Sequence, residues 1–332
     1  MVKLGELSIF RTELMGISAL CILICHLYGY VDLSVTVRYI LSLGNVGVDL
    51  FLFLSGMGMW NSLSKTKCGA IKYWYIHRYL KLFVPYLVTI LPFDILRYAL
   101  GQPIGSNFMD YLFGLSTLRF YVSHDAPWFI AALIPLYLLS PLFCRLIMKY
   151  QWKAVVILVL VLYLGLFVPT SFRSGLLNDV IENIQFVAVR APAFVLGIAL
   201  GQSINENKQL PLWGLIILSI LGILIIIITH HLVYGYFFII LPLLFVLCKL
   251  IKSCGKWGRV FFQIMGKISL ESYILNGVLP KLVVAVFVVL NLPSIGNIIP
   301  YIIACLVSIP IGYGFHKISM IILDNIRFSI TK

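Results

Sequence analysis

Charged residues are scarce in this sequence. Asp, Glu, Lys and Arg make up 11% of its 332 residues, and only 12 residues are acidic, whereas soluble domains carry about 25% charged residues. Hydrophobic residues reach 61%, against about 45–50% in soluble domains. So few charges cannot cover the surface of a soluble globule of this length. The composition therefore predicts an integral membrane protein.

Period-two alternation is also missing from the apolar stretches, which argues against a membrane-spanning barrel. Each stretch runs for about 17–22 residues, enough for a helix to cross a hydrocarbon core about 30 Å thick. The sequence therefore predicts an all-α, polytopic transmembrane helix bundle with about ten spans. We place the spans at residues 12–30, 46–63, 82–99, 128–147, 154–170, 186–202, 211–229, 232–249, 268–289 and 298–322.

Cysteines with redox or metal-ligand spacing are absent as well. The seven cysteines form no CxxC and no Cys/His pattern, and they lie in predicted spans or predicted cytoplasmic segments. They are Cys21, Cys25, Cys68, Cys144, Cys248, Cys254 and Cys305. Neither a disulfide framework nor a metal site is expected.

Basic residues outnumber acidic ones, and their positions predict the topology. Nineteen of the 25 Lys and Arg residues fall on one side of the predicted spans. The other six are Arg38, Arg97, Arg119, Arg173, Arg190 and Lys281. Because basic loops face the cytoplasm, we expect both termini inside the cell. The net charge of +13 is then a topology signal, and no nucleic-acid partner is expected.

Three loops interrupt the apolar pattern. The predicted cytoplasmic loops 64–81 and 250–267 are basic, and the longest predicted outer loop, 100–127, is aromatic and partly charged. We expect one membrane domain over residues 1–332, with no appended soluble domain. The first apolar run has no small-x-small cleavage site and continues for a full span, so it should act as an uncleaved signal anchor.

Ionisable residues within the spans are candidate functional residues, because each costs a few kcal/mol to insert. They are His26, with Arg11 and Glu13 at the cytoplasmic entrance of the first span, and Asp49, Asp94, Arg97, Arg190, Glu271 and Lys281. Arg11 and His26 share one helical face but lie roughly 22 Å apart along the axis. One face could thus serve a ligand stretched across the bilayer. The alternative is a snorkelling interfacial arginine and a hydrogen-bonded structural histidine.

Asp49 lies a few residues inside the outer end of the second predicted span, at about the depth expected for His26. A carboxylate beside a histidine fixes its tautomer and raises its basicity, as a general base requires. We therefore predict that Asp49 contacts His26. Alternatively, Asp49 is a helix-start residue favoured by the helix dipole.

Arg78 and Lys81 lie three residues apart, on one helical face at the predicted inner interface. Such a pair can bind the phosphates of a cytoplasmic, nucleotide-like donor. The alternative is a pair of topology signals.

The segments that carry these residues resemble the acyltransferase 3 family of integral membrane proteins, which O-acylate sugars, peptidoglycan and antibiotics. Six segments, in the family's order, carry the resemblance: Arg11 to Gly16 with His26, Gly47 to Gly56 (GVDLFLFLSG), Arg78 to Tyr86, Trp128 to Ile130 with Tyr137, Arg190 to Gly197 (RAPAFVLG), and Gly266 to Asn276 (GKISLESYILN).

Three positions depart from the family pattern. Met15 stands where the family has an arginine eleven residues before the histidine, and Arg11 lies one turn earlier on nearly the same face. Asn276 replaces a second histidine, so we assign it no proton transfer. Lys81 replaces a commoner arginine and lacks the bidentate fork.

The resemblance implies that acyl-CoA docks from the cytoplasm and that a hydroxyl acceptor, a glycan or glycolipid, arrives from outside. His26 and Asp49 would be catalytic, and Arg11, Arg78 and Lys81 would bind the donor. Further candidate site residues are Ser55, Trp128, Arg190, Ser269 and Tyr273. Acetyl-CoA is the expected donor substrate, with no bound cofactor, in a multi-pass protein of the plasma (inner) membrane.

Two other classes of function compete with the enzyme. In a transporter or flippase for a lipid-linked saccharide, the buried charges would line a path, although the two halves show no matching Gly/Pro interruptions. A sensor or scaffold leaves the ordered motifs unexplained. The sequence does not specify the acceptor, the acyl group, a partner enzyme or the oligomeric state.

Overall fold

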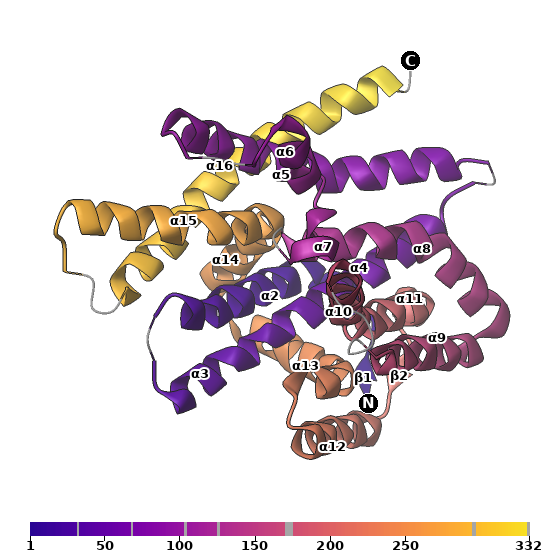
Figure 1. Cartoon of the computed structure of the whole chain (residues 1–332). Coiled ribbons are helices and arrows are strands. Elements are labelled where there is room, and N and C mark those ends of the chain that lie inside the picture. Colours follow the sequence, from indigo (N-terminus) through magenta and orange to yellow (C-terminus); the bar gives the residue numbers. More distant parts are fainter. Residues whose placement is uncertain are drawn as a thin grey trace. The chain divides into compact units, whose positions relative to one another are not determined.

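The structure is a computed structural model, and it describes residues 1–31, 33–67, 69–102, 105–124, 127–169, 175–293 and 297–330, without the side chains of 327–330. Cys68, Asp125, Arg173 and Lys332, and the side chain of Arg327, lie outside the described part. Within that part the regular secondary structure is helical apart from two short strands (Figure 1). The predicted all-α class is confirmed.

Sixteen α-helices and two strands make up the described elements. In chain order they are β1 (Val2–Lys3), α1 (Glu6–Ile9), α2 (Arg11–His26), α3 (Val35–Ser42), α4 (Val46–Leu63), α5 (Ile71–Ala99), α6 (Phe108–Leu115), α7 (Arg119–Ser123), α8 (Trp128–Tyr150), α9 (Trp152–Leu164), α10 (Leu176–Ala188), α11 (Ala191–Asn205), β2 (Gln209–Leu210), α12 (Leu212–Thr229), α13 (Leu232–Ser253), α14 (Lys256–Lys267), α15 (Ser269–Val289) and α16 (Ile298–Ile330). Three 3-10 turns accompany them, at Leu27–Gly29, Leu43–Asn45 and Gly165–Phe167.

Nine stretches of the described residues are helical, long and apolar enough to cross a membrane. They are Arg11–Gly29, Val35–Leu63, Ile71–Ala99, Trp128–Tyr150, Leu176–Asn205, Leu212–Thr229, Leu232–Ser253, Ser269–Val289 and Ile298–Ile326. Each matches one of the predicted spans, and the polytopic helical bundle is confirmed. The orientation of the bundle in the membrane stays a prediction.

The remaining predicted span, 154–170, coincides with a shorter apolar helix, Trp152–Phe167. Its last turn leaves backbone carbonyls without helical partners, as every helix end does. The amide of Gln185 donates hydrogen bonds of 3.2, 3.3 and 2.8 Å to the carbonyl oxygens of Gly165, Leu166 and Val168. A side chain of α10 thus satisfies the end of this helix.

Three of the nine stretches begin well before the predicted spans, at Val35, Ile71 and Leu176. The second predicted span, 46–63, is preceded by α3, where the Ser34 side chain accepts a hydrogen bond from the Val37 amide as an N-cap. The third, 82–99, belongs to α5, which begins at Ile71 within the predicted loop 64–81. The basic and aromatic residues of this segment lower its hydropathy but do not disfavour a helix.

The described chain divides into two compact units. Unit 1 comprises Met1–Arg11, Asp49–Arg78 and Ile104–Lys249, and unit 2 comprises Thr12–Val48, Tyr79–Pro103 and Leu250–Lys332. The expectation of one domain over residues 1–332 stays a prediction.

Glycines allow α4 and α11 of unit 1 to pack backbone to backbone. A Cβ on Gly56 would lie 2.1 Å from the carbonyl oxygen of Phe194, and a Cβ on Gly197 would lie 2.1 Å from that of Phe53. Both glycines belong to motifs singled out in the sequence. Their lack of a side chain therefore fixes how closely these two helices approach.

Unit 2 uses the same device between α2 and α14. A Cβ on Gly16 would lie 2.0 Å from the carbonyl oxygen of Phe262, and one on Gly266 would approach that of Thr12 even more closely. The helices α15 and α16 lie side by side in this unit (Figure 1). Leu275 and Leu279 pack there with Ala304 as a buried cluster.

Candidate active site

The candidate residues divide between the two units. Unit 1 contains Arg11, Asp49, Ser55, Arg78, Trp128 and Arg190, and unit 2 contains His26, Lys81, Ser269 and Tyr273. In unit 1 the polar residues gather at two levels along α4. Asp49 and Gly58 mark these levels, nine residues or about 13 Å apart along the helix.

At the first level, Asp49 forms a buried ion pair with Arg190. Arg190 Nη1 donates a 2.6 Å hydrogen bond to Asp49 Oδ2, and each side chain is only 3% exposed. The guanidinium carbon lies 5.5 Å from the ring centre of Trp128 and 5.9 Å from that of Phe186. Aromatic faces attract such a cation. Three of the predicted site residues, Asp49, Arg190 and Trp128, are thus brought together.

The pair leaves one donor of Arg190 unused. Its Nε is buried and has no hydrogen-bond partner among the described residues. An unsatisfied buried donor costs free energy comparable to a lost hydrogen bond. A polar atom of a bound substrate or a water molecule in this place would remove that cost.

At the second level, two arginines from different helices bind backbone carbonyls of α4. Arg11 donates from Nε and Nη2 to the Leu54 carbonyl oxygen, at 3.3 and 3.2 Å, and Arg78 donates from Nη2 to the Gly58 carbonyl oxygen at 3.2 Å. Leu54 and Gly58 are one helical turn apart. Both arginine side chains are half-buried.

Glycine at position 58 makes room for Arg11. A Cβ at this position would lie 2.9 Å from Arg11 Nη2, closer than a carbon and a nitrogen normally approach. The sequence analysis assigned no role to Gly58. A glycine in the middle of a helix of bulky residues is the signal that could have revealed it.

Tyr137 of α8 completes this cluster. Its hydroxyl interacts electrostatically with both guanidinium groups and shares a hydrogen bond with the Ser55 side chain. Tyr137 was part of a motif in the sequence but was not among the predicted site residues. It links Ser55 to the arginine pair.

The arginine pair carries two like charges without a balancing carboxylate. Among the described residues, neither Arg11 nor Arg78 has an ion-pair partner, and each guanidinium repels the other. Carbonyl dipoles satisfy single donors but leave the net charge in place. A half-buried pair of guanidinium groups with free donors is suited to a phosphate or another anion.

In unit 2, His26 lies at the end of α2, and Arg11 of unit 1 begins the same helix, as predicted. The His26 side chain hydrogen-bonds the side chain of Asn276. Asn276 Nδ2 donates a 3.1 Å hydrogen bond to the Tyr301 hydroxyl, which itself donates to the Leu23 carbonyl oxygen at 2.5 Å. This network ties His26 to α15 and α16. Asn276, where many family members have histidine, is thus the polar partner of His26.

The other candidates of unit 2 lie on α15 and α5. Ser269 begins α15 and is buried, and Tyr273 follows one turn later, half-buried. Lys81 is exposed on α5, three residues after Arg78. The predicted contact of His26 with Asp49 joins residues of the two units and stays a prediction.

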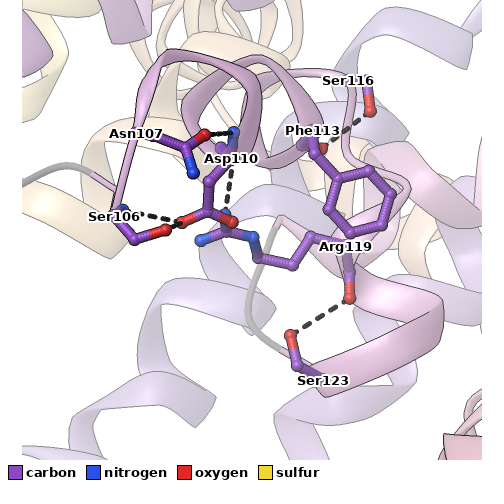
Figure 2. Close-up of polar contacts among 7 residues, drawn as sticks. All are labelled: Ser106, Asn107, Asp110, Phe113, Ser116, Arg119 and Ser123. Carbon is purple, nitrogen blue, oxygen red and sulfur yellow. Dashed lines mark hydrogen bonds and ion pairs between the residues drawn. The ribbon is translucent and has the colours of Figure 1, made fainter.

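The predicted outer loop contains two short helices, α6 and α7, held by one aspartate (Figure 2). Asp110 accepts hydrogen bonds from the Ser106 amide and hydroxyl, at 2.8 and 3.1 Å, and pairs with Arg119. The hydrogen bond from the Ser106 amide, with those from its hydroxyl and from Arg119, holds the pKa of Asp110 below its usual value. Asp110 and Arg119 thus have structural partners of their own.

A row of aromatic rings leads from the end of this loop to Arg190. The rings of His124 and Phe186 lie 5.3 Å apart, and those of Phe186 and Trp128 lie 4.9 Å apart. His124 Nδ1 contacts Asn183 Oδ1 at 2.6 Å. Burial raises the pKa of the neighbouring Tyr121 to about 12, so this hydroxyl stays neutral. The sequence analysis did not single out Phe186 or Asn183.

Comparison with known proteins identifies the family. Residues 14–317 match the sequence profile of the acyltransferase 3 family, which is described as an acyltransferase domain. No curated protein and no solved structure matches the chain. The matched range includes every predicted site residue except Arg11. This multi-pass membrane protein therefore belongs to the acyltransferase 3 family and is a membrane acyltransferase.

Proposed function

We propose that the protein transfers an acyl group, with acetyl as the preferred group, from cytoplasmic acyl-CoA to a hydroxyl of an extracytoplasmic glycan or glycolipid. Transfer would take place in the plasma (inner) membrane, with both termini in the cytoplasm. The observation that carries the proposal is the Arg11–Arg78 pair, which has two half-buried positive charges and no carboxylate partner among the described residues.

The phosphates of the donor would supply the negative charge that balances the two arginines. Coenzyme A carries several phosphate oxygens, and arginine binds phosphate through parallel charge-assisted hydrogen bonds. Lys81, exposed on the same helix as Arg78, adds a third positive charge near the predicted cytoplasmic surface. The Ser55–Tyr137 hydrogen bond keeps the tyrosine hydroxyl beside the two guanidinium groups.

His26 is the proposed general base. In its neutral form it takes the proton of the acceptor hydroxyl while the hydroxyl oxygen attacks the thioester carbonyl carbon. The tetrahedral intermediate then collapses with cleavage of the carbon–sulfur bond, and the departing CoA thiolate takes up the proton from His26. The ester of the acceptor and free CoA are the products, and no oxidant or metal is consumed.

The neighbours of His26 support this role. A base must present a lone pair to the substrate, which requires a fixed tautomer and ring orientation. The Asn276 side chain hydrogen-bonds the imidazole, and Tyr301 holds Asn276 in turn. Asn276 has no proton to exchange in this range of pH, so it acts as a positioning residue.

The Asp49–Arg190 pair is proposed to serve the acceptor side. The buried Nε of Arg190, which has no hydrogen-bond partner among the described residues, would donate one hydrogen bond to a substrate oxygen. Trp128 and Phe186, which cover the guanidinium, also suit the apolar face of a sugar ring. Asp49 remains the predicted partner that orients His26.

Transfer of labelled acetyl from acetyl-CoA to envelope glycans tests the proposal. His26→Ala should abolish the labelled ester while the unmodified glycan still reaches the surface. Replacement of both Arg78 and Lys81 by Gln should raise the KM for acetyl-CoA, with Lys267→Gln, an exposed lysine of α14, as the matched control. An unchanged KM would reduce Arg78 and Lys81 to topology signals. Loss of the surface glycan itself in His26→Ala would favour a flippase.

A further inference from the structure

Unit 1 contains two neighbouring hollows that the proposed mechanism does not use. An apolar groove of about 480 Å³ lies between α9, α11, α12 and α13, and a polar hollow of about 300 Å³ lies between α4, α8, α9 and α11. Trp152 lines both. Trp152 is 55% exposed and lies where the two hollows meet.

The groove is built for a hydrocarbon chain. Every residue that lines it is apolar, including Leu196 and Leu200 of α11, Trp213 of α12 and Phe237 of α13. Its size falls in the range of about 300–1,000 Å³ that small-molecule sites occupy. Trp213, 67% exposed, stands with Trp152 at its rim, and tryptophan pairs of this kind are typical of the membrane–water interface.

The hollow next to it is built for a polar head. Its polar lining residues are Gln151, Gln202, Ser203 and Lys208, which lie beside apolar residues such as Val155. Lys208 pairs with Glu206 at 2.7 Å, but both side chains are exposed, so this ion pair contributes little and leaves further ammonium donors for a ligand.

The charge around the polar hollow is positive. Lys149 and Lys153 flank Gln151 and Trp152 in the chain, and Lys3 pairs with Gln209 across the two-stranded sheet. Lys208 is the charged residue among those that line the hollow, and the other three lysines lie close to its lining residues in the sequence or across the sheet. Basic residues at a membrane surface attract anionic lipid, and each contributes about fivefold to its binding.

The polar hollow lies on a different side of α4 from the arginine pair. Trp60 lines the hollow, whereas the Gly58 carbonyl accepts the hydrogen bond from Arg78. Residues two positions apart on a helix, such as Gly58 and Trp60, point about 200° away from each other. Trp60 packs against Gly201 of α11. The hollow is therefore separate from the donor site proposed above.

The N-terminal segment supports the groove. Strand β1 pairs antiparallel with β2, with Val2 opposite Leu210, and Leu210 lines the groove. The Leu4 amide also donates a 2.9 Å hydrogen bond to the Lys208 carbonyl oxygen. The segment that connects α11 to α12 is thus held in place on both sides of the two hollows.

From these features we infer that unit 1 carries a binding site for one anionic glycerophospholipid. Its phosphate head would occupy the polar hollow beside Lys208, and one acyl chain would lie in the apolar groove between Leu196 and Trp213. Bulk lipid would contact an apolar groove of this kind in any membrane protein. The adjoining basic hollow is what selects an anionic head.

Native mass spectrometry of the full-length protein can test the site. The protein is equilibrated with an equal mixture of phosphatidylglycerol and phosphatidylcholine with identical chains, and the retained lipids are counted. The wild-type protein should retain one phosphatidylglycerol in preference to phosphatidylcholine. Lys208→Gln should reduce that preference by about fivefold, while Lys267→Gln should leave it unchanged.

A second pair of variants tests the groove. A Cβ on Gly214, which lines the groove, would meet only Pro211 Cγ, at 3.6 Å, so Gly214→Leu starts its side chain in open space beside the groove and also improves helix propensity. It should reduce retention of both lipids. Gly314→Leu is the matched control, because a Cβ on Gly314 of α16 meets nothing within 4 Å. Thermal unfolding in detergent establishes that both variants fold.

Three results would overturn the inference. Equal lipid preference in Lys208→Gln and Lys267→Gln would remove the role of the polar hollow. Equal retention in Gly214→Leu and Gly314→Leu would reduce the groove to bulk lipid contact. Displacement of phosphatidylglycerol by palmitoyl-CoA would assign the groove to the donor's acyl chain. These measurements involve no acyl transfer, so they are independent of the proposed function.

Discussion

Arg190 and Asp49, 141 residues apart in the chain, form an ion pair of 2.6 Å in which each side chain is 3% exposed. Removing two charges from water is costly, and their attraction offsets that cost only while both are present. Loss of one partner leaves a buried charge alone, whereas loss of both leaves none. Variants of the pair should therefore change the free energy of unfolding as well as the activity.

Asp49→Asn is expected to destabilise the protein by about 3–5 kcal/mol, because Arg190 keeps its charge in a buried place. Asp49→Asn combined with Arg190→Gln should recover much of that loss, since neither buried charge remains. Thermal unfolding in detergent measures both variants. Additive losses in the double variant would show that the two residues do not act as a pair.

The partner of His26 can be identified from activity in double variants. His26→Ala should lower kcat by about 10²–10⁴-fold, the usual contribution of a general base. Adding Asn276→Ala to His26→Ala should do little further harm, because residues that act as one unit are non-additive. The same should hold for Asp49→Asn if Asp49 orients His26.

Each combination has a clear contrary outcome. Multiplicative losses of kcat in His26→Ala with Asp49→Asn would limit Asp49 to its pair with Arg190. Multiplicative losses with Asn276→Ala would mean that the hydrogen bond between Asn276 and His26 does not serve the reaction. Because Asp49→Asn also lowers stability, the rates are compared at a temperature where every variant is folded.

The sequence predicted the membrane helices well because hydrophobic length is a strong signal. It did not predict that α5 begins at Ile71 or that α3 precedes α4, since amphipathic and basic helices at the membrane surface have low hydropathy. It placed a full span at 154–170, where the structure has a shorter helix, Trp152–Phe167, whose end is satisfied by Gln185.

The sequence named the candidate residues of the site but not most of the contacts that these residues make. Arg11, Arg78, Asp49 and Arg190 were all candidates, but the arginine pair binds backbone carbonyls, which carry no sequence signature. The Asp49–Arg190 pair could have been anticipated, because charges inside a bundle tend to pair with each other. The Phe186 ring lies over the Arg190 guanidinium because of the way α10 packs. The distance in sequence between Phe186 and Trp128 does not predict this contact.

The predicted topology is testable by labelling single cysteines in a variant without the seven native ones. A reagent that cannot cross the membrane, added from outside, should label a cysteine at Ser106 or Ser123 and miss one at Ser64 or Ser253. Ser123 is the safer outer position, because its side chain donates to the Arg119 carbonyl oxygen of its own helix, whereas the Ser106 side chain donates to the Asp110 carboxylate. The reverse pattern would exchange the donor and acceptor sides.

The most specific prediction for the donor site concerns Gly58. In Gly58→Ala, the added Cβ would lie 2.9 Å from Arg11 Nη2, and a flexible guanidinium moves aside more easily than a helix. The fold should therefore survive, while the KM for acetyl-CoA should rise by about tenfold, since hydrogen bonds to charged groups contribute about 1.5–3 kcal/mol. Arg11→Gln should raise the KM to a similar extent, and Gly58→Ala added to it should have little further effect.

Gly314→Ala is the matched control, because its Cβ has open space around it. An unchanged KM in both Gly58→Ala and Arg11→Gln would separate this arginine from donor binding, and the arginine pair would then serve only to satisfy the carbonyl oxygens of Leu54 and Gly58.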